Sequence, residues 1–296
     1  MFRVLNNIIE NDIRDSGLDF YSVIIGMKPS HGARSPKLWN KVYTFEGKNI
    51  RMVPLDVKEN NLKYLLDYLK EDKNCLGGAI AVPYKEKMFN LMKDNLEEEI
   101  KNIGAINCFY RPTSQSLIDE FTGTNTDGEA ALEPIRKQLT ENYNLTIGLL
   151  GFGGAGKAIY AFLQRYFKKK HIIKIFNRSA KNIADSKKII TNAYPLSNLE
   201  TYLPSFDLLI NATSAGHVEN IYATPVPENL LMKAKKTLVV YDIIYDPIKT
   251  ILLKNAEDLG LRTINGLSMN IFQAVLAYKY SNPTNLAIEK IYKAMS

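Results

Sequence analysis

The chain has 296 residues, 46% of them hydrophobic and 23% charged, with a formal net charge of +7. This composition is typical of a globular protein, and the length allows two domains with a substantial core. It excludes a membrane-spanning protein, because no uncharged apolar run reaches the roughly 18 residues that a spanning helix needs, and the scattered lysines argue against a nucleic-acid-binding surface.

The cysteine and histidine content limits the kinds of site to expect. Only Cys75 and Cys108 occur, too far apart for a paired-cysteine motif, so we expect neither a disulfide framework nor a zinc site. The histidines show no metal-ligand spacing, and we expect no bound metal. The absence of a disulfide pattern fits a reducing cytoplasm, and the N-terminus carries acidic and amide residues where a signal peptide has an apolar core.

Short β-rich runs alternate with helical patterns from end to end, which is typical of an α/β protein with largely parallel sheets. The segment before Tyr21 has a pattern that suggests a helix or an extra strand. After it, the patterns predict strands over 21–26, 49–54 and 78–82, and helices over 62–69 and 85–92.

The second part of the chain continues this alternation. Its predicted elements are a helix over 128–139, strands over 145–150, 172–176, 206–210 and 237–241, and final helices over 267–280 and 284–294. We therefore expect a two-domain α/β protein: an α/β substrate domain (1–128), a Rossmann-type doubly wound parallel sheet (129–265) and C-terminal helices that return to the first domain (266–296). A cleft between two such domains is a usual site of ligand binding.

A glycine-rich turn follows the strand predicted at 145–150. It reads Gly151-Phe152-Gly153-Gly154-Ala155-Gly156 and leads into a helical stretch over 157–168. Glycines at such a turn let the backbone approach a pyrophosphate, whose charge then lies at the helix N-terminus. The turn therefore predicts a dinucleotide-binding site.

The end of the next strand indicates which dinucleotide is bound. The strand at 172–176 is followed by Asn177-Arg178-Ser179, where NAD-preferring folds carry a carboxylate for the ribose hydroxyl. An arginine at this place can neutralise a 2′-phosphate, so Arg178 predicts NADP(H) as the cofactor.

Lys85 is the first candidate for catalysis. It lies just beyond the strand predicted at 78–82, at the edge where open α/β sheets place ligands, and a lysine can act as a general acid or base. The alternative is a solvated face at a helix start, formed by Lys85, Glu86 and Lys87. Local sequence alone favours that alternative.

Asp127 is the second candidate. It stands in Gly123-Thr124-Asn125-Thr126-Asp127-Gly128, immediately before a predicted helix, where a carboxylate can hold an ammonium group or a substrate hydroxyl. However, Thr126 with Glu129 also fits a capping box, so these polar residues are equally explained by a helix start.

Three further polar positions follow predicted strands or a glycine. The run from Asn211 to Gly216 suits a loop at the cofactor edge or an ordinary glycine-ended turn. Tyr245 and Gln273 are weak candidates on their own, with a turn and a helix surface as their alternatives.

Taken in order, these fragments resemble shikimate dehydrogenases from about Val23 to Ala277. The motifs that carry the resemblance are Ser35-Pro36, Val82 to Glu86, Gly104 to Asn107, Gly123 to Gly128, Gly151 to Gly156, Asn177 to Ser179, Asn211 to Ser214, Asp242 to Pro247, and Gly266 to Met269 with Gln273-Ala274. Their shared order along the chain makes the resemblance specific.

The resemblance implies NADPH-dependent, reversible reduction of 3-dehydroshikimate to shikimate, in the route to chorismate and the aromatic amino acids. It implies that Lys85 exchanges a proton with the substrate oxygen while hydride moves to or from the nicotinamide, and that Asp127 hydrogen-bonds the substrate and Lys85. The other residues it implies are Ser35, Asn107, Tyr245 and Gln273 for substrate, and Gly151, Gly153, Gly154, Ala155, Gly156, Asn177, Arg178, Ser179, Lys181, Thr213, Ser214 and Met269 for cofactor.

The substrate loop departs from the family pattern, in which two serines near a histidine grip the substrate carboxylate. Here the loop reads His31-Gly32-Ala33-Arg34-Ser35-Pro36, which is one residue longer and lacks the first serine. Arg34 is new beside this site, and it can replace the lost serine by pairing with a carboxylate through two hydrogen bonds.

Further departures affect other contacts to substrate and cofactor. Ala79 and Ala81 stand where the family has an asparagine and a threonine, Cys108 replaces a threonine, Trp39 replaces a histidine, and Ser268 takes a usual glycine position. A site built to bind a hydroxyl can discriminate by roughly 10⁴-fold, so losing such donors should relax or redirect specificity.

Two alternatives therefore stay open beside shikimate itself. One is a related oxidoreductase acting on quinate, an amino-shikimate or another cyclic hydroxy acid, which the altered loop and Ala81 favour. The other is a non-catalytic NADP(H)-binding sensor, although a binding module has no evident need for both Lys85 and Asp127. The expected partner is a small molecule, not nucleic acid or a membrane, and the sequence leaves open whether the chain forms a homodimer.

Overall fold

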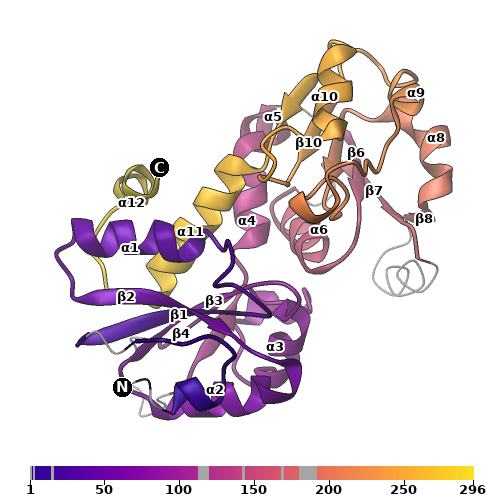
Figure 1. Cartoon of the computed structure of the whole chain (residues 1–296). Helices are drawn as coiled ribbons and strands as arrows, with labels where there is room; N and C mark the ends of the chain where they lie inside the picture. The colour runs from indigo at the N-terminus through magenta and orange to yellow at the C-terminus, as the bar shows by residue number, and fades with distance from the viewer. Residues whose placement is uncertain are drawn as a thin grey trace. The chain divides into compact units, whose positions relative to one another are not determined.

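The computed structural model of the chain describes residues 2, 4–14, 17–112, 120–141, 144–167, 170–179 and 192–296. Within these residues the chain forms two compact units (Figure 1). The first unit joins Met1–Thr126 to Ile271–Ser296, and the second unit is Asp127–Asn270. The functions that the sequence assigns to residues 1–128, 129–265 and 266–296 stay predictions.

The first unit contains a five-stranded sheet in the order β2-β1-β3-β4-β5. Its strands are β1 (Phe20–Gly26), β2 (Ile50–Asp56), β3 (Cys75–Ile80), β4 (Cys108–Tyr110) and β5 (Thr122–Thr124). β1 pairs in parallel with β2 and β3, whereas β4 runs antiparallel to β3 and β5. The sequence did not predict β4 and β5, because strands of 3 residues are too short to show an alternating pattern.

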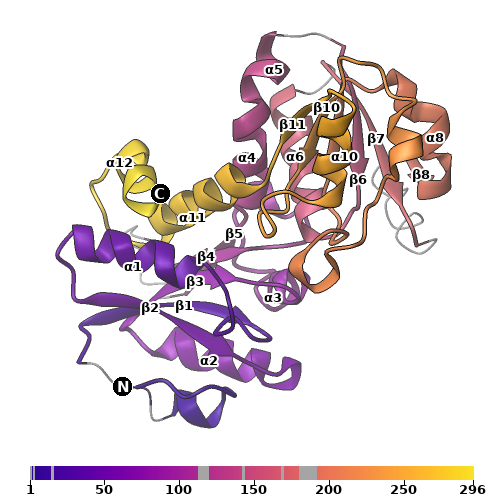
Figure 2. The same ribbon diagram turned by 45° about the horizontal axis from the view of Figure 1, so that its top comes forward.

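Helices cover both faces of this first sheet. They are α1 (Ser35–Phe45), α2 (Leu62–Glu71), α3 (Lys85–Leu91) and the part of α11 (Leu267–Ser281) from Ile271 onward, and α12 (Ile288–Met295) packs against α1. α1 and α2 lie on opposite faces of the sheet in both views (Figure 1, Figure 2). The buried residues of α2 recur at helical spacing and form the stripe that faces the sheet: Leu62, Leu65, Leu66 and Leu69.

Trp39 joins α1 to α11 inside the first unit. Its side chain is fully buried, its Nε1 donates a hydrogen bond to the carbonyl oxygen of Ala274 at 3.1 Å, and its ring meets Tyr278 edge-on. The indole therefore fixes α11 against α1, which explains how a large aromatic residue fits where the family has a histidine.

The outer edge of β2 is covered by amide side chains and by the N-terminal segment. Asn40 of α1 accepts from the backbone N–H of Met52 at 2.8 Å and donates to the carbonyl oxygen of Met52 at 3.4 Å. Further along the strand, the side chain of Asn11 donates to the carbonyl oxygen of Pro54 at 3.0 Å and accepts from the N–H of Asp56 at 2.7 Å. The described part of the N-terminal segment contains a short 3₁₀ turn, Leu5–Asn7, where the sequence suggested a helix or an extra strand.

The second unit contains a six-stranded sheet in the order β11-β10-β9-β6-β7-β8, with every neighbouring pair parallel. Its strands are β6 (Thr146–Leu150), β7 (Ile172–Asn177), β8 (Ala193–Pro195), β9 (Leu208–Asn211), β10 (Val239–Asp242) and β11 (Arg262–Ile264). The chain order steps outward from β6 on both sides, which is the doubly wound arrangement that the sequence predicted.

The helices of the second unit in its described residues are α4 (Asp127–Leu132), α5 (Arg136–Glu141), α6 (Gly154–Phe167), α8 (Leu199–Tyr202), α9 (Glu228–Leu231), α10 (Ile251–Asp258) and the start of α11. The prediction of one helix over 128–139 is wrong, because a 3₁₀ turn at Glu133–Ile135 separates α4 from α5. Pro134 lies in that turn, and a proline lacks the N–H that a continuous helix would use.

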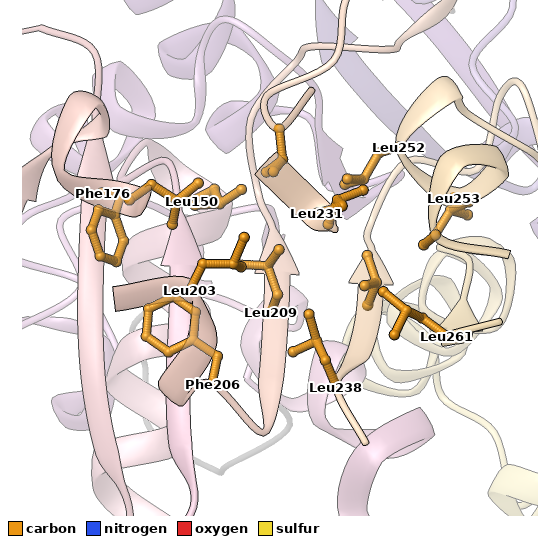
Figure 3. Close-up of a cluster of buried hydrophobic side chains, with 14 residues drawn as sticks. Leu150, Phe176, Leu203, Phe206, Leu209, Leu231, Leu238, Leu252, Leu253 and Leu261 are labelled. Atoms are coloured by element: carbon orange, nitrogen blue, oxygen red, sulfur yellow. The ribbon is translucent and has the colours of Figure 1, made fainter. Parts of the chain in front are cut away.

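A cluster of buried apolar side chains holds one face of the second sheet (Figure 3). Leu150, Leu209 and Val240 of the strands lie in one cluster with Leu252 and Leu253 of α10. Each fully buried leucine contributes about 1.5–3 kcal/mol to folding. The cluster thus anchors the strands whose carboxyl ends carry the predicted cofactor residues. None of the helices in the described ranges has the length and apolarity needed to cross a bilayer.

Candidate functional site

The glycine-rich turn joins β6 to α6. Gly151 has a φ of +87°, a backbone conformation that favours glycine, and its N–H donates to the carbonyl oxygen of Phe176 at 2.8 Å. The side chain of Asn177, at the end of β7, accepts from the N–H of Phe152 at 3.0 Å. Two hydrogen bonds to β7 therefore fix the turn, and α6 begins directly in it at Gly154.

Gly153 and Gly156 differ in the space around them. A Cβ at Gly153 would meet no heavy atom within 4 Å, so the backbone there faces open space that suits a bound phosphate. A Cβ at Gly156 would overlap the carbonyl oxygen of Gly151. Gly156 therefore allows α6 to pack closely against the turn, as the third glycine of dinucleotide-binding turns does.

Replacing Gly156 with alanine should lower the free energy of unfolding by about 1–3 kcal/mol, because the added methyl group forces the backbone of the turn apart. Gly153→Ala should change it far less, since open space surrounds that position. The denaturant midpoints of the two variants, measured without cofactor, check this. Equal midpoints for the two variants would contradict the close contact.

The remaining residues predicted around the cofactor differ in where they lie. Arg178 and Ser179 are exposed directly after β7, as the prediction of a 2′-phosphate contact requires. Met269 is buried in the first turns of α11. Lys181 lies outside the described residues.

Thr213 is held beside the glycine-rich turn. Its hydroxyl donates to Oδ1 of Asn211 at 2.7 Å, and its N–H donates to the same oxygen at 3.0 Å. A Cβ at Gly151 would lie 2.9 Å from the methyl group of Thr213. The structure thus brings together two predicted cofactor elements, the turn and the loop after β9, within one unit. Ser214 follows on the exposed side of that loop.

Asp242, at the end of β10, connects this loop to its neighbours. Its carboxylate accepts from Asn211 Nδ2 at 3.0 Å, from the N–H of Ile244 at 3.1 Å and from the hydroxyl of Thr250 at 2.7 Å. Burial raises the pKa of Asp242 to about 6, although these three donors favour its charged form. The carboxylate therefore ties the loop of Thr213 to the segment that carries Tyr245, which is half-buried.

In the first unit, Asn107 and Gln273 are brought together. Asn107 Nδ2 lies 3.4 Å from Oε1 of Gln273 and donates to the hydroxyl oxygen of Thr126 at 2.9 Å. The hydroxyl of Thr126 donates to the carbonyl oxygen of Gln273 at 3.0 Å. Thr126 thus links β5 to α11, so its side chain does more than begin a helix. Two predicted substrate residues, distant in sequence, share one polar cluster.

Lys85 is the first residue of α3 and is half-buried. Its carbonyl oxygen accepts from the N–H of Ile106 at 3.1 Å, which places its backbone beside the residue before Asn107. The strand before it ends at Ile80 rather than at the predicted Val82, so the connection between the strand and Lys85 is longer than predicted. Asp127 is buried at the start of α4, in the second unit, and its pairing with Lys85 stays a prediction.

The residues that depart from the family pattern have separate structural roles. Ala81 is half-buried, and its Cβ lies 3.1 Å from the position that a Cβ on Gly26 would take. Cys108 packs its sulfur 3.4 Å from the hydroxyl of Ser281. Burial raises the pKa of Cys108 to about 12, so the thiol stays protonated and acts as a packing group.

Arg34 and Ser35 lie at the start of α1 and are half-buried. Sequence reasoning missed Asp56, and it placed Asn211 and Asp242 in motifs without giving either a supporting role, although all three hold the site loops. The signal they share is a polar side chain at the last position of a buried strand, since Asn211 ends β9, Asp242 ends β10 and Asp56 ends β2. The carboxyl ends of parallel strands are where open α/β sheets bind ligands.

The six-stranded parallel sheet with its glycine-rich turn, together with a smaller mixed sheet that carries a polar cluster, defines a two-domain dinucleotide-binding α/β protein. The family model described as the shikimate dehydrogenase substrate binding domain matches residues 24–109. The shikimate dehydrogenase (NADP(+)) of Methanocaldococcus jannaschii is 31% identical over 266 residues, covering 86% of this chain and 90% of that protein.

Two further comparisons agree. The shikimate dehydrogenase (NADP(+)) of Pyrococcus furiosus is 33% identical over 256 residues, covering 86% of this chain and 88% of that protein. A crystal structure of a shikimate dehydrogenase in complex with NADP+ is 28% identical and matches with a TM-score of 0.75, covering 93% of this chain and 94% of that one. The chain belongs to the shikimate dehydrogenase family of oxidoreductases. The resemblance and the fold class predicted from sequence are therefore confirmed.

Proposed function

We propose that this chain catalyses the reversible, NADPH-dependent reduction of 3-dehydroshikimate to shikimate. Family membership supports this reaction, and so does the presence of Lys85 and Asp127, the two residues proposed to handle the proton. The observation that carries the proposal is the cluster of Asn107, Thr126 and Gln273 in the first unit, next to the start of α3, whose first residue is Lys85. This cluster offers amide and hydroxyl groups to a polyhydroxylated ring.

The residues of the second unit fit NADP(H). Gly153 and Gly156 give the turn an open side for a pyrophosphate and a closed side for the helix. Arg178, exposed after β7, supplies the positive charge for a 2′-phosphate. When bound, NADPH supplies a hydride to the carbonyl carbon of the substrate. Thr213 and Met269 would border the cofactor from the loop after β9 and from α11.

In this proposal Lys85 and Asp127 move and direct the proton. Lys85 donates a proton to the carbonyl oxygen as that oxygen gains negative charge, and it takes the proton back in the oxidation direction. Asp127 accepts hydrogen bonds from the substrate hydroxyl and from the Lys85 ammonium group, so it orients both. Asn107, Gln273 and Tyr245 would bind the ring hydroxyls, and Ser35 with Arg34 would bind the carboxylate.

A second function is favoured by the missing donors. Ala81 offers no hydroxyl where the family has a threonine, and the substrate loop lacks its first serine. A cyclic hydroxy acid such as quinate would therefore be a substrate of the same catalytic groups. An NADP(H)-binding sensor without turnover is the remaining candidate. We further propose a cytoplasmic location, which the two buried free cysteines support, and a small molecule as the partner.

The test is an assay of the purified chain with NADP+ and either shikimate or quinate, following the ultraviolet absorbance of NADPH. Robust turnover with shikimate is expected. Turnover with quinate but not shikimate would replace the proposal with the second function. NADPH binding, measured by fluorescence, without turnover on a panel of cyclic hydroxy acids would overturn both enzymatic functions.

A further inference from the structure

Asp56 is a buried carboxylate at the end of β2 that serves the connection between β1 and α1, residues 27–34, in which the substrate loop begins. The residue is 4% exposed, so its charge needs hydrogen-bond donors. Both carboxylate oxygens accept hydrogen bonds from the same loop residue, Ser30. Oδ1 accepts from the N–H of Ser30 at 2.9 Å, and Oδ2 accepts from the hydroxyl of Ser30. These two hydrogen bonds attach the loop to the end of β2 at two points.

The neighbouring histidine adds little to this attachment. His31 Nδ1 lies 3.7 Å from Oδ2 of Asp56, but its side chain is 77% exposed, and exposed ion pairs stabilise proteins weakly. Nδ1 of His31 also lies 2.9 Å from the hydroxyl oxygen of Ser30. The two bonds to Ser30 are therefore the ones that hold the loop.

The strand end that carries Asp56 is itself fixed on its outer side. The carbonyl oxygen of Asp56 accepts from the N–H of Glu10 at 2.7 Å, and the N–H of Asp56 donates to Oδ1 of Asn11 at 2.7 Å. On the inner side, the N–H of Val57 donates to the carbonyl oxygen of Gly26 at 3.0 Å. The N-terminal segment thus completes a rigid base for the carboxylate.

Hydrogen-bonded turns connect Ser30 to Arg34 and Ser35, the residues proposed to bind the substrate carboxylate. The N–H of Ala33 donates to the carbonyl oxygen of Pro29 at 3.2 Å, and the N–H of Leu38 donates to the carbonyl oxygen of Arg34 at 3.0 Å. Consecutive turns therefore run from Ser30 to the start of α1. A loop that is one residue longer than the family pattern has more conformations to lose, and an anchor near its centre limits them.

We propose that Asp56 is a positioning residue for recognition of the substrate carboxylate. By holding Ser30 at two points, it fixes the substrate loop in the shape that presents Arg34 and Ser35. The proposal rests on the proposed function, in which these two residues bind the acid. It also assigns a role to the N-terminal segment, which supports the backbone of Asp56.

Asp72 provides a matched control. Its carboxylate accepts from the hydroxyl of Tyr21 at 2.7 Å and from the N–H of Asn74 at 3.0 Å, the same two kinds of donor. It lies in the same unit but in the turn before β3, whereas Asp56 is the last residue of β2. Loss of either carboxylate removes one bond from a hydroxyl and one from a backbone N–H, but only the bonds of Asp56 hold the loop.

Steady-state kinetics with the full chain tests the proposal. Asp56→Ala and Ser30→Ala should each raise the KM for shikimate by about tenfold, the effect of losing a hydrogen bond to a charged group. The KM for NADP+ and kcat should change little. Asp56→Asn should restore most of the affinity, because its oxygen still accepts from the N–H of Ser30 and its amide can donate to the hydroxyl. Asp72→Ala should leave the KM for shikimate unchanged.

Amide hydrogen exchange of the loop tests the anchoring role of Asp56 without relying on the proposed reaction. Peptides covering residues 27–34 should exchange faster in Asp56→Ala than in wild type, and at the wild-type rate in Asp72→Ala. If wild type turns over no acid but the exchange result holds, the reaction fails and the anchoring role stands. Ser30 is exposed, so Ser30→Ala does not threaten the core. Unchanged KM and unchanged exchange in that variant would overturn the proposal even if Asp56→Ala does not fold.

Discussion

Replacing Lys85 with alanine is expected to lower kcat with shikimate and NADP+ by about 10²–10⁴-fold, the usual contribution of a general acid or base. The KM for NADP+ should stay near its wild-type value, because the cofactor residues lie in the other unit. The proton of the substrate hydroxyl would then have to pass to water, which is neither positioned nor concentrated at that atom.

Lys87 is the matched control for this substitution. It stands two residues further on in the same helix, α3, and forms an ion pair with Glu59 while 41% exposed. Lys87→Ala removes the same charge from the same helix but should leave kcat within a few-fold of wild type. Equal losses in the two variants would show that the charge of α3, rather than a proton on Lys85, supports turnover.

Replacing Arg178 with alanine is expected to raise the KM for NADP+ by about 10- to 100-fold, the effect of losing hydrogen bonds to a charged phosphate. The KM for NAD+ should change little, since that cofactor has no 2′-phosphate. The preference between the two cofactors therefore falls by the same factor. Parallel titrations of both cofactors at fixed shikimate give the two KM values.

Arg262 serves as the control for the loss of a positive charge. It is exposed on β11, at the other edge of the same sheet. Arg262→Ala lowers the net charge equally but should leave both KM values unchanged. If Arg178→Ala keeps the wild-type affinity for NADP+, other residues bind the 2′-phosphate. The prediction that Arg178 selects NADP(H) would then be wrong.

The sequence predicts elements well where one physical pattern dominates. β1 and α2 were predicted almost to their ends, because β1 is a short apolar run rich in β-branched residues and the leucine stripe of α2 has the helical period. Sequence-based prediction fails where contacts with distant parts of the chain determine the secondary structure. β4 exists because it pairs between β3 and β5, and its 3 residues carry no period of their own.

The candidate site divides in the same way. Glycines are readable from sequence because backbone geometry demands them, and Gly151 and Gly156 have the conformations or close contacts that make them necessary. The hydrogen bonds that hold the site loops cannot be predicted from the sequence. Nothing near Asp56 in sequence indicates that it holds Ser30, because the two residues meet only when β1 and β2 pair.

The covered edge of β2 also bears on self-association. An exposed strand edge offers a ladder of free backbone groups to which another chain can add a strand. Here the amide groups of Asn40 and Asn11 already occupy that ladder at Met52, Pro54 and Asp56. A second copy would have to break these bonds before it could extend the sheet. If the chain forms a homodimer, the two copies will therefore meet through packed side chains on another surface, and the sheet will end at β2 in each.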